Sequence, residues 1–364
     1  MSSKILFLEP FYGGSHRDFA DGLVKHSRHE ITLYTLPARF WKWRMRGASL
    51  HFAREIPDPQ KYDLLLVSDM LSLSDLKAMW TERCPPSVIY FHENQLSYPL
   101  PEGEDMDLHF GFTNIVSCLV AEGLLFNSHY QLNSFLFEMP RFIARMPEQR
   151  PHWTTDNIGQ KARVLYPGCN FPSMQTPRLQ AGERSQSPLI LWNHRWEFDK
   201  APERFFDAME IIDEEGLSFQ LALLGENFQA LPKPFINAKN RFADRILQYG
   251  YVESKREYFH WLERADIVIS TAIQENFGIS IVEAMRCGCA PILPNRLSYP
   301  EILPEEFHQF CLYQSKEELV KKTEAVINDP GKIDTGQLSS SMARYSWEAS
   351  INDYDDYFDQ IFDH

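Results

Sequence analysis

The stretch Asp266–Pro291 reads DIVISTAIQENFGISIVEAMRCGCAP and has the order strand, turn, helix. Residues 267–269 (Ile-Val-Ile) form a β-branched run, typical of a strand buried on both faces of a parallel sheet. Residues 276–278 (Asn-Phe-Gly) supply a turn, and the apolar residues that follow at helical spacing predict a helix that ends near Gly288. The first amides of such a helix lack intrahelical partners, so the stretch predicts a phosphate site in an α/β fold.

Two carboxylates flank this predicted helix start. Glu275 lies in the turn, and Glu283 lies in the helix, within about 8 Å of its start at a rise of roughly 1.5 Å per residue. A carboxylate can accept hydrogen bonds from both neighbouring hydroxyls of a ribose, which suits Glu283 and leaves Glu275 facing a sugar. In the alternative interpretation, Glu275 complements the helix dipole and Glu283 is a solvated helix residue.

The two glutamates, the Phe277-Gly278 pair between them and the following Glu-Ala-Met…Gly-Cys-Ala-Pro resemble the C-terminal signature of retaining glycosyltransferases of family four. The resemblance implies the GT-B fold, an α/β architecture of two doubly wound Rossmann-like domains that face each other across a cleft. It also implies a nucleotide-sugar donor. Glu275 would then orient the donor sugar and Glu283 the ribose, with Asn276, Phe277, Gly278 and Ile279 beside the donor phosphates.

Length and composition agree with two domains. The chain has 364 residues, 44% of them hydrophobic, which is enough for two α/β domains of ordinary size. Its formal net charge of −14 argues against a protein whose whole surface binds nucleic acid. A local basic patch remains compatible with that charge.

The cysteines and the N-terminus predict a cytoplasmic protein. The six cysteines show no CxxC spacing, which favours reduced thiols. The chain opens on a strand over residues 4–8 without a leader, and no apolar run approaches about 18 residues, so neither secretion nor membrane insertion is expected.

The loop EPFYGGSH at residues 9–16 joins that first strand to a helix over residues 18–25. Gly13 and Gly14 allow positive φ and a close backbone approach to a ligand. The GxGxxG spacing of a dinucleotide site is absent, so no NAD site is expected. By the family resemblance, Gly13, Gly14 and His16 lie beside the donor diphosphate and sugar; the alternative is a plain tight turn.

The segment ARFWKWRMRGASLHF at residues 38–52 is unusual in an acidic chain. Cationic and planar side chains alternate in it, a pattern that can pair with phosphates and stack on unpaired bases. In the alternative, the segment is an amphipathic lid whose Trp side chains pack on the core and whose Arg side chains are solvated. The residues predicted to contact a nucleic acid are Arg39, Trp41, Lys42, Trp43, Arg44 and Arg46.

The string HENQLSYP at residues 92–99 follows a predicted strand over residues 87–91. Open α/β sheets hold their active sites at such strand ends. By the family resemblance His92 touches the donor sugar. Together with PFYGGSH and the Trp/Arg segment, this string is similar to the tRNA-queuosine α-mannosyltransferases over nearly the whole chain. Glu93, Asn94 and Gln95 would then help to bind the acceptor.

The domain boundaries follow from composition. Residues 172–188 lack hydrophobic periodicity and predict a linker between an acceptor-binding domain (1–171) and a nucleotide-sugar-binding domain (189–345). Residues 346–364 carry an aromatic stripe and predict a helix that crosses back to the first domain. The last helix commonly does so in GT-B proteins.

The second domain carries an Arg-x4-Lys pattern at Arg195 and Lys200. Both side chains can reach the two phosphates of a nucleotide sugar, as the family resemblance implies, although alone they would be a surface charge pair. Gly225 follows a strand near the nucleotide base in that family. Tyr251 and Val252 are candidates for holding the base edge.

These assignments predict a retaining transfer in which Arg195, Lys200, Glu275 and His92 are the catalytic group. The closer resemblance implies GDP-mannose as donor and the cyclopentenediol of queuosine in a tRNA anticodon of the tRNA-Asp type as acceptor. No DxD pair follows a strand in the proper place, so neither a metal nor a bound cofactor is expected. The alternatives are a glycan, lipid or small-molecule acceptor, a nucleotide-sugar epimerase and a non-catalytic RNA-binding protein.

Overall fold

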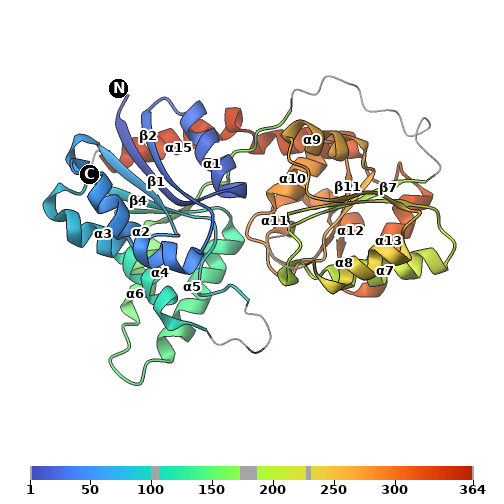
Figure 1. Cartoon of the computed structure of the whole chain (residues 1–364), viewed down its shortest axis with the longest axis horizontal. Helices are drawn as coiled ribbons and strands as arrows, with labels where there is room; N and C mark the ends of the chain where they lie inside the picture. The colour runs from blue at the N-terminus through green and yellow to red at the C-terminus, as the bar shows by residue number, and fades with distance from the viewer. Residues whose placement is uncertain (1, 100–102, 104–105, 173–186, 227–230, 363–364) are drawn as a thin grey trace. The chain divides into compact units, whose positions relative to one another are not determined.

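The structure is a computed structural model that describes residues 2–99, 103, 106–172, 187–226 and 231–362. Two six-stranded sheets appear in it, with strand orders β2-β1-β3-β4-β5-β6 and β12-β11-β10-β7-β8-β9. Neighbouring strands run parallel and helices connect them, so the prediction of two Rossmann-like domains is confirmed (Figure 1). Each sheet belongs to one compact unit.

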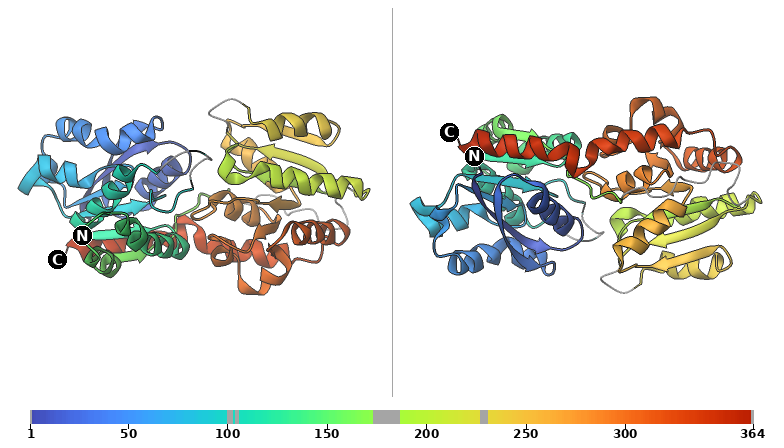
Figure 2. Two further views of the ribbon diagram at one scale, coloured as in Figure 1. Left: turned by 90° about the horizontal axis from the view of Figure 1, so that it is seen from below. Right: turned by 90° about the horizontal axis from the view of Figure 1, so that it is seen from above.

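Unit 1 contains residues 1–170 and 345–364. Its helices α1 and α15 cover one face of the sheet, and α2 to α6 cover the other (Figures 1 and 2). The strands are β1 (Lys4–Tyr12), β2 (Glu30–Pro37), β3 (Leu64–Ser68), β4 (Ser87–Phe91), β5 (Gly123–Phe126) and β6 (Ala162–Val164). The helices are α1 (Gly14–His26), α2 (Trp41–Glu55), α3 (Leu73–Trp80), α4 (Leu108–Val120), α5 (His129–Ala144), α6 (Trp153–Lys161) and α15 (Trp347–Phe362).

Successive side chains of a strand face opposite sides of the sheet, so each strand of unit 1 contributes residues to the core on both sides. On β1, Ile5 and Phe7 pack toward α1 and α15, whereas Leu6 and Leu8 pack toward the opposite helices. All four are fully buried because helices cover both faces, and this explains the continuous apolar run in the sequence. The same run places the first polar residue, Glu9, at the carboxyl end of the apolar part of the strand.

Unit 2 contains residues 171–344. Helices α9 and α10 lie on one face of its sheet and α7, α8 and α13 on the other (Figure 1). Its strands are β7 (Leu189–Asn193), β8 (Gln220–Leu224), β9 (Ile246–Gly250), β10 (Ile267–Ile269), β11 (Ala290–Pro294) and β12 (Leu312–Tyr313). Its helices are α7 (Pro202–Glu214), α8 (Lys233–Arg241), α9 (Lys255–Arg264), α10 (Ile279–Arg286), α11 (Tyr299–Ile302), α12 (His308–Cys311), α13 (Lys316–Asn328) and α14 (Thr335–Ser341).

Two sequence expectations differ from the structure or fall outside it. The first strand does not end at Leu8 but continues to Tyr12, because Glu9 pairs with Thr35 and Tyr12 with Pro37 on β2. Of the predicted linker 172–188, residues 173–186 lie outside the described residues.

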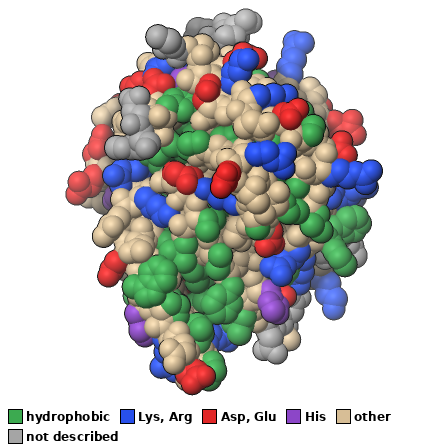
Figure 3. Space-filling view, turned by 90° about the vertical axis from the view of Figure 1, so that its left-hand side faces the viewer, with side chains coloured by type: hydrophobic (Ala, Val, Ile, Leu, Met, Phe, Trp, Pro, Cys, Tyr) green, Lys and Arg blue, Asp and Glu red, His purple; other side chains and the backbone are tan. Residues whose placement is uncertain are grey.

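The surface of unit 1 shown in Figure 3 mixes both signs of charge. Lys and Arg side chains are interspersed with Asp and Glu, and hydrophobic side chains gather in the lower half of the view. This face therefore lacks the one-signed field that would attract a polyanion.

Within the described residues, no helix combines the length and apolar character needed to cross a membrane. All six cysteines are described, and each is a free thiol.

Candidate active site

In unit 1, polar side chains meet at the carboxyl edge of the sheet. Parallel strands bring their carboxyl ends to one edge, so Glu9 of β1, Asp69 after β3 and His92 after β4 become neighbours. His16 joins them from the first turn of α1. Glu9, His16 and Asp69 are buried, and the His92 side chain is only 8% exposed.

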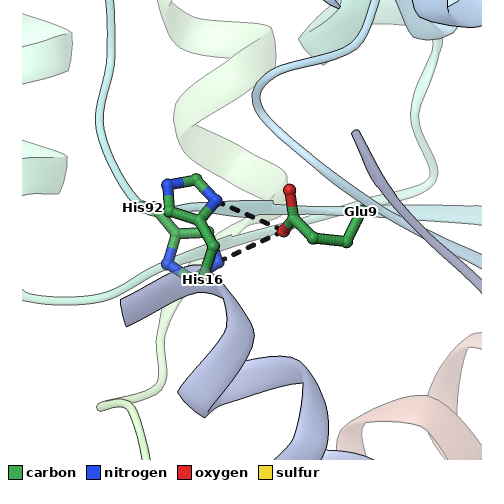
Figure 4. A group of neighbouring side chains, drawn as sticks. All are labelled: Glu9, His16 and His92. Atoms are coloured by element: carbon green, nitrogen blue, oxygen red, sulfur yellow. Dashed lines mark ion pairs between the residues drawn. The ribbon is translucent and has the colours of Figure 1, made fainter. Parts of the chain in front are cut away.

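The Glu9 carboxylate is the centre of this group (Figure 4). Its Oε1 accepts hydrogen bonds from the backbone N–H of Phe11 at 2.8 Å and from the Ser68 hydroxyl at 3.0 Å. Its Oε2 lies 3.3 Å from Nδ1 of His16 and 3.8 Å from Nε2 of His92. The two imidazole rings stack with centroids 3.9 Å apart and planes 29° from parallel.

The surroundings shift the pKa values of the two histidines in opposite directions. Burial alone would lower the pKa of His16, but the charges of Glu9, Asp69 and Glu93 outweigh it and raise that pKa above its ordinary value. Burial and the neighbouring His16 hold the pKa of His92 well below its ordinary value. Burial, with the charge of Glu93, raises the pKa of Asp69 to about 8.

The same three side chains are the group in the described part of the chain that could offer ligands to a metal ion. One atom each of Glu9, His16 and His92 lies within 4.8 Å of the others. An imidazole binds a metal along the lone pair in its ring plane. The two facing ring nitrogens and Oε2 of Glu9 are close enough to contact one small group together. Metal independence stays a prediction.

Hydrogen bonds hold the backbone of residues 92–97. Asp69 Oδ1 accepts from the N–H of His92 at 2.8 Å, and the Asn127 side chain donates to the carbonyl oxygen of His92 at 2.9 Å. Of the predicted acceptor-binding residues, Asn94 is buried and its Oδ1 accepts from the N–H groups of Leu96 and Ser97. The Asn94 oxygen therefore stabilises this turn.

The other two predicted acceptor-binding residues of this loop contact each other. Gln95 donates from its side chain to Glu93 at 3.3 Å, and its backbone N–H donates to Asn114. Both side chains are half-buried. They lie beside the Glu9 group because they follow the same strand end as His92.

The predicted glycine turn has two different local causes. Gly14 has φ +52° at the start of α1, in the left-handed region that favours glycine. Gly13 is extended, and a Cβ there would lie 2.5 Å from Cβ of Ala38. The backbone of the turn therefore requires both glycines, whether or not a ligand binds there. The turn also lies next to His16.

The basic-aromatic segment forms helix α2. Trp41 packs on Phe110 with centroids 5.1 Å apart, and Lys42 lies over the Trp41 ring. Trp43 does not pack on the core, because 78% of it is exposed. Arg39 and Lys42 are also exposed, whereas Arg44 donates to the carbonyl oxygen of Pro37 and Arg46 to the Thr113 hydroxyl.

In unit 2, Lys200 is a buried cation between two carboxylates. Its Nζ donates to the carbonyl oxygen of Gln274 at 2.7 Å and lies 3.2 Å from Asp199 and 3.4 Å from Glu275. Burial lowers the pKa of Lys200, but Glu275 and Asp199 outweigh this and raise it above the ordinary value. The ammonium group therefore stays charged beside the turn that carries Glu275.

Arg195 is the more exposed member of the predicted pair. Its side chain is 45% exposed, and its Nη2 lies 3.2 Å from Glu197. Such an exposed ion pair contributes little to stability, so exchange of Glu197 for a ligand phosphate costs little. The structure thus brings Lys200 and Glu275 into direct contact and leaves Arg195 at the surface of the same loop.

Glu283 is not a solvated helix residue, because its side chain is only 6% exposed. The Tyr258 hydroxyl donates to its Oε2 at 2.7 Å, and Lys255 lies 3.4 Å from its Oε1. Burial and the charge of Glu283 hold the pKa of Tyr258 well above its ordinary value, so the hydroxyl keeps its proton. Asn193, at the end of β7, donates to the same hydroxyl at 2.9 Å.

The turn between β10 and α10 has the predicted form. Gly278 is the N-cap of α10 and has φ +92°. Asn276 accepts a hydrogen bond from Gln274, Phe277 is buried, and Ile279 is the first residue of the helix. The backbone amides of this first helical turn are suited to an anion.

The predicted base-binding residues surround the end of β8 and β9. Gly225 has φ +150°, and a Cβ there would lie 1.9 Å from the carbonyl oxygen of His194, so the close backbone approach requires glycine. Tyr251 is 55% exposed and Val252 is nearly buried. The Trp196 ring stacks on Phe235 beside this turn, with centroids 3.8 Å apart.

Sequence reasoning missed several residues of these two groups. Glu9 follows the strand predicted over residues 4–8, and Asp69 follows the apolar run at residues 64–68, so both are carboxylates at strand ends that the sequence can reveal. No sequence signal links Tyr258 to Glu283. Asn193 is the last residue of β7, and no sequence pattern marks it.

Two family models match adjacent parts of the chain. Residues 4–169 match the model described as tRNA-queuosine alpha-mannosyltransferase N-terminal, and residues 175–346 match glycosyl transferases group 1. The tRNA-queuosine alpha-mannosyltransferase of Drosophila melanogaster is 36% identical over 326 residues, which are 87% of this chain and 85% of that protein.

Solved structures show the same fold at low identity. Sucrose-phosphate synthase from Thermosynechococcus elongatus has a TM-score of 0.73 at 14% identity, with 99% of both chains covered. The catalytic domain of starch synthase IV from Arabidopsis thaliana has a TM-score of 0.72 at 13% identity, with 100% of both chains covered. Anabaena HepE in complex with UDP-glucose has a TM-score of 0.65 at 17% identity, with 99% of both chains covered. The expected GT-B fold is confirmed, and the chain belongs to the tRNA-queuosine alpha-mannosyltransferase family of glycosyltransferases.

Proposed function

We propose that the protein transfers mannose from GDP-mannose to the cyclopentenediol of queuosine in a tRNA anticodon of the tRNA-Asp type, with retention at the anomeric carbon. The single observation that carries this proposal is the 36% identity to a named tRNA-queuosine alpha-mannosyltransferase over 87% of the chain. The proposed location is cytoplasmic, since the six thiols are free.

Unit 2 supplies the proposed donor site. Departure of the nucleoside diphosphate places negative charge on its phosphates, which Lys200, Arg195 and the amides around Gly278 stabilise. Glu275 orients the sugar hydroxyls next to Lys200. Glu283, held by Tyr258, accepts the ribose hydroxyls.

Unit 1 supplies the proposed acceptor and sugar contacts. His92 contacts the donor sugar, and Gly13, Gly14 and His16 lie near the diphosphate. The exposed cations and the Trp43 ring on α2 bind the anticodon phosphates and an unstacked base. This explains why a chain of net charge −14 concentrates cations on one helix.

The test is incubation of the protein with radiolabelled GDP-mannose and total tRNA from cells with and without queuosine. Label is expected only in tRNA that contains queuosine, and UDP-glucose with the same tRNA is the donor control. Label in both tRNA pools, or in neither, would overturn the acceptor assignment. Label from UDP-glucose but not from GDP-mannose would overturn the donor assignment.

A further inference from the structure

The first turn of α2 carries two aromatic rings that lie largely in solvent. Phe40 is 69% exposed and Trp43 is 78% exposed. The two residues belong to one turn, because the N–H of Trp43 donates to the carbonyl oxygen of Phe40 at 2.8 Å. Trp41, which lies between them in the sequence, packs on Phe110. The turn therefore gives one ring to the core and two to the surface.

The backbone of Phe40 is strained. Its φ of 54° and ψ of 50° lie in the left-handed region, which costs free energy for a residue that has a Cβ. Glycine adopts this conformation at lower cost, and a ring that stays in water adds little burial to offset the difference. Residues held in such conformations cluster at ligand-binding and active sites. The fold tolerates a phenylalanine at position 40 but does not need one.

Cations surround the two rings. Arg39 and Lys42 are exposed, and the Arg39 guanidinium lies 5.9 Å from the centroid of the Phe40 ring. Residues 38–52 contain neither Asp nor Glu, although the whole chain has a net charge of −14. Flat rings among cations suit a ligand that is both planar and anionic, which an unpaired nucleotide is.

The same turn lies against the loop of residues 9–16. A Cβ on Gly13 would lie 2.5 Å from Cβ of Ala38, so the chain just before the first exposed ring touches the glycine turn. Phe11 and Trp41 pack together on a buried cluster that includes Met45. A base on the exposed rings is thus held next to the loop that carries the polar group of unit 1.

We propose that Phe40 and Trp43 form a two-ring platform on which unpaired bases of an RNA loop stack, and that the left-handed backbone of Phe40 holds its ring out for this contact. Arg39 and Lys42 pair with the flanking phosphates. The proposal rests on the proposed function, in which the acceptor is an RNA, and it adds Phe40 to the residues that bind it. Every base has a π face, so the platform orders the loop without selecting a sequence.

The test is filter binding of queuosine-containing tRNA to the full-length protein. Phe40→Ala is expected to weaken binding about tenfold, because stacking on one ring contributes about that much. The matched control is Phe137→Ala on α5, since Phe137 is 60% exposed and also has an arginine, Arg141, 3.9 Å over its ring. An unchanged affinity in Phe40→Ala, or an equal loss in Phe137→Ala, would overturn the proposal.

Trp43→Ala tests the second ring independently and is expected to lower the affinity to a similar extent. Its matched control is Trp153→Ala, because Trp153 is 57% exposed at the start of α6 in the same unit. Full tRNA affinity in Trp43→Ala would show that the two rings do not act together and would overturn the platform.

Two further measurements separate stacking from attraction between charges. The plot of log binding constant against log salt concentration is expected to keep its slope in Phe40→Ala, since no phosphate contact is lost. An RNA duplex without a loop is expected to bind the wild type and Phe40→Ala equally, because its bases are already stacked. A changed slope, or a loss of duplex binding, would show that the ring acts through the shape of α2 and would contradict stacking.

The strained backbone is tested with Phe40→Gly. Both Phe40→Gly and Phe40→Ala lack the ring, so they are expected to bind tRNA equally weakly. Phe40→Gly is expected to unfold at a higher denaturant concentration than Phe40→Ala, because glycine fits the left-handed conformation. Equal unfolding midpoints would overturn the role of the backbone.

Other outcomes assign the rings or the function differently. If sedimentation shows a dimer that Phe40→Ala dissociates while tRNA affinity is unchanged, the rings bind a second copy of the chain and the proposal is overturned. The binding test needs no donor. If tRNA binding depends on Phe40 but no mannose is transferred, the proposed function alone is overturned. If tRNA binds and mannose is transferred equally with and without the ring, the platform alone is overturned.

Discussion

At the scale of residues, the structure shows that the buried charges of unit 2 depend on one another. Lys200 lies between Asp199 and Glu275 and is almost fully enclosed. Removal of one member of a buried charged group leaves the others without compensation, which typically costs about 3 to 5 kcal/mol. The same ammonium group is proposed to meet the leaving phosphate.

Lys200→Met is therefore expected to lower kcat by a factor of about 100 or more and to lower the free energy of unfolding of unit 2. Rates are measured by mannose transfer and stability by denaturant unfolding. Lys316→Met is the matched control, because Lys316 pairs with Asp207 at the surface of the same unit and little change is expected. Full activity of Lys200→Met would contradict its assignment.

Tyr258→Phe is expected to weaken donor binding about tenfold without changing the fold. The lost hydroxyl donates to the charged Glu283 at 2.7 Å, and a hydrogen bond to a charged group contributes about 1.5 to 3 kcal/mol. Calorimetric titration with GDP-mannose measures the effect. Tyr313→Phe removes a hydroxyl that donates to the carbonyl oxygen of Ser270, and its donor affinity should match the wild type.

Site residues could be predicted from the sequence where they lie close together along the chain. The turn from Glu275 to Gly278 and the following helix are contiguous, so strand, turn and carboxylates could be read together. The Glu9 group could not, because its members come from three strands and one helix that only the sheet order brings together. Tyr258 reaches Glu283 from a neighbouring helix, and nothing in the sequence marks that contact.

At the scale of elements, α2 shows what the composition of a segment can and cannot predict about its structure. The alternation of cations and aromatic rings in residues 39–46 predicted contact with nucleic acid but not a helix, since bulky aromatic residues have modest helix propensity. The helix separates the two tryptophans: Trp41 packs on Phe110, and Trp43 is exposed. Only the exposed ring suits stacking on a base.

Charge reversal of Arg39, Lys42 and Arg44 to Glu is expected to weaken tRNA binding by a factor of about 10 or more. It is also expected to reduce the salt dependence of binding. Each lost phosphate contact makes the plot of log binding constant against log salt concentration less steep by about 0.7 to 0.9. Reversal of three exposed cations of unit 1 that lie outside α2, Lys25, Lys61 and Arg141, is the matched control. Filter binding at several salt concentrations measures both, and equal effects of the two variants would contradict a specific role for α2.

Helices α1 and α15 meet at a glycine. A Cβ on Gly22 of α1 would lie 1.9 Å from Nε1 of Trp347, so Gly22→Ala is expected to destabilise unit 1 by about 1 to 3 kcal/mol. Gly47→Ala on α2 meets no atom within 4 Å and is expected to stabilise the same unit by up to about 1 kcal/mol. Denaturant unfolding measures the change in the free energy of unfolding for both variants. A change of the same sign in both would contradict the close contact between Gly22 and Trp347.

At the scale of the whole molecule, unit 2 is inserted into unit 1. The chain leaves unit 1 after Asn170 and returns to it at Tyr345. Helix α15 then contributes Trp347, Tyr354 and Phe358 to the core beside α1. Each of these buried aromatic side chains contributes roughly 2 to 3 kcal/mol.

Deletion of residues 345–364 is therefore expected to remove the protection of β1, β3 and β4 from amide hydrogen exchange while the strands of unit 2 keep theirs. The double substitution Asn352→Ala and Asp353→Ala, at exposed positions of α15, is expected to leave the protection of unit 1 unchanged. Unaltered exchange in the deletion variant would show that the core of unit 1 does not need α15.

The return of the chain to unit 1 at Tyr345 also determines the order in which the two units can fold during synthesis on the ribosome. Unit 2 is continuous and can fold as soon as it has emerged, whereas unit 1 waits for residues 345–364. Until then the apolar surface beside α1 that α15 covers is open to chaperones and proteases. A chain that ends before residue 345 thus keeps that surface exposed, and proteases that degrade unfolded protein can reach it.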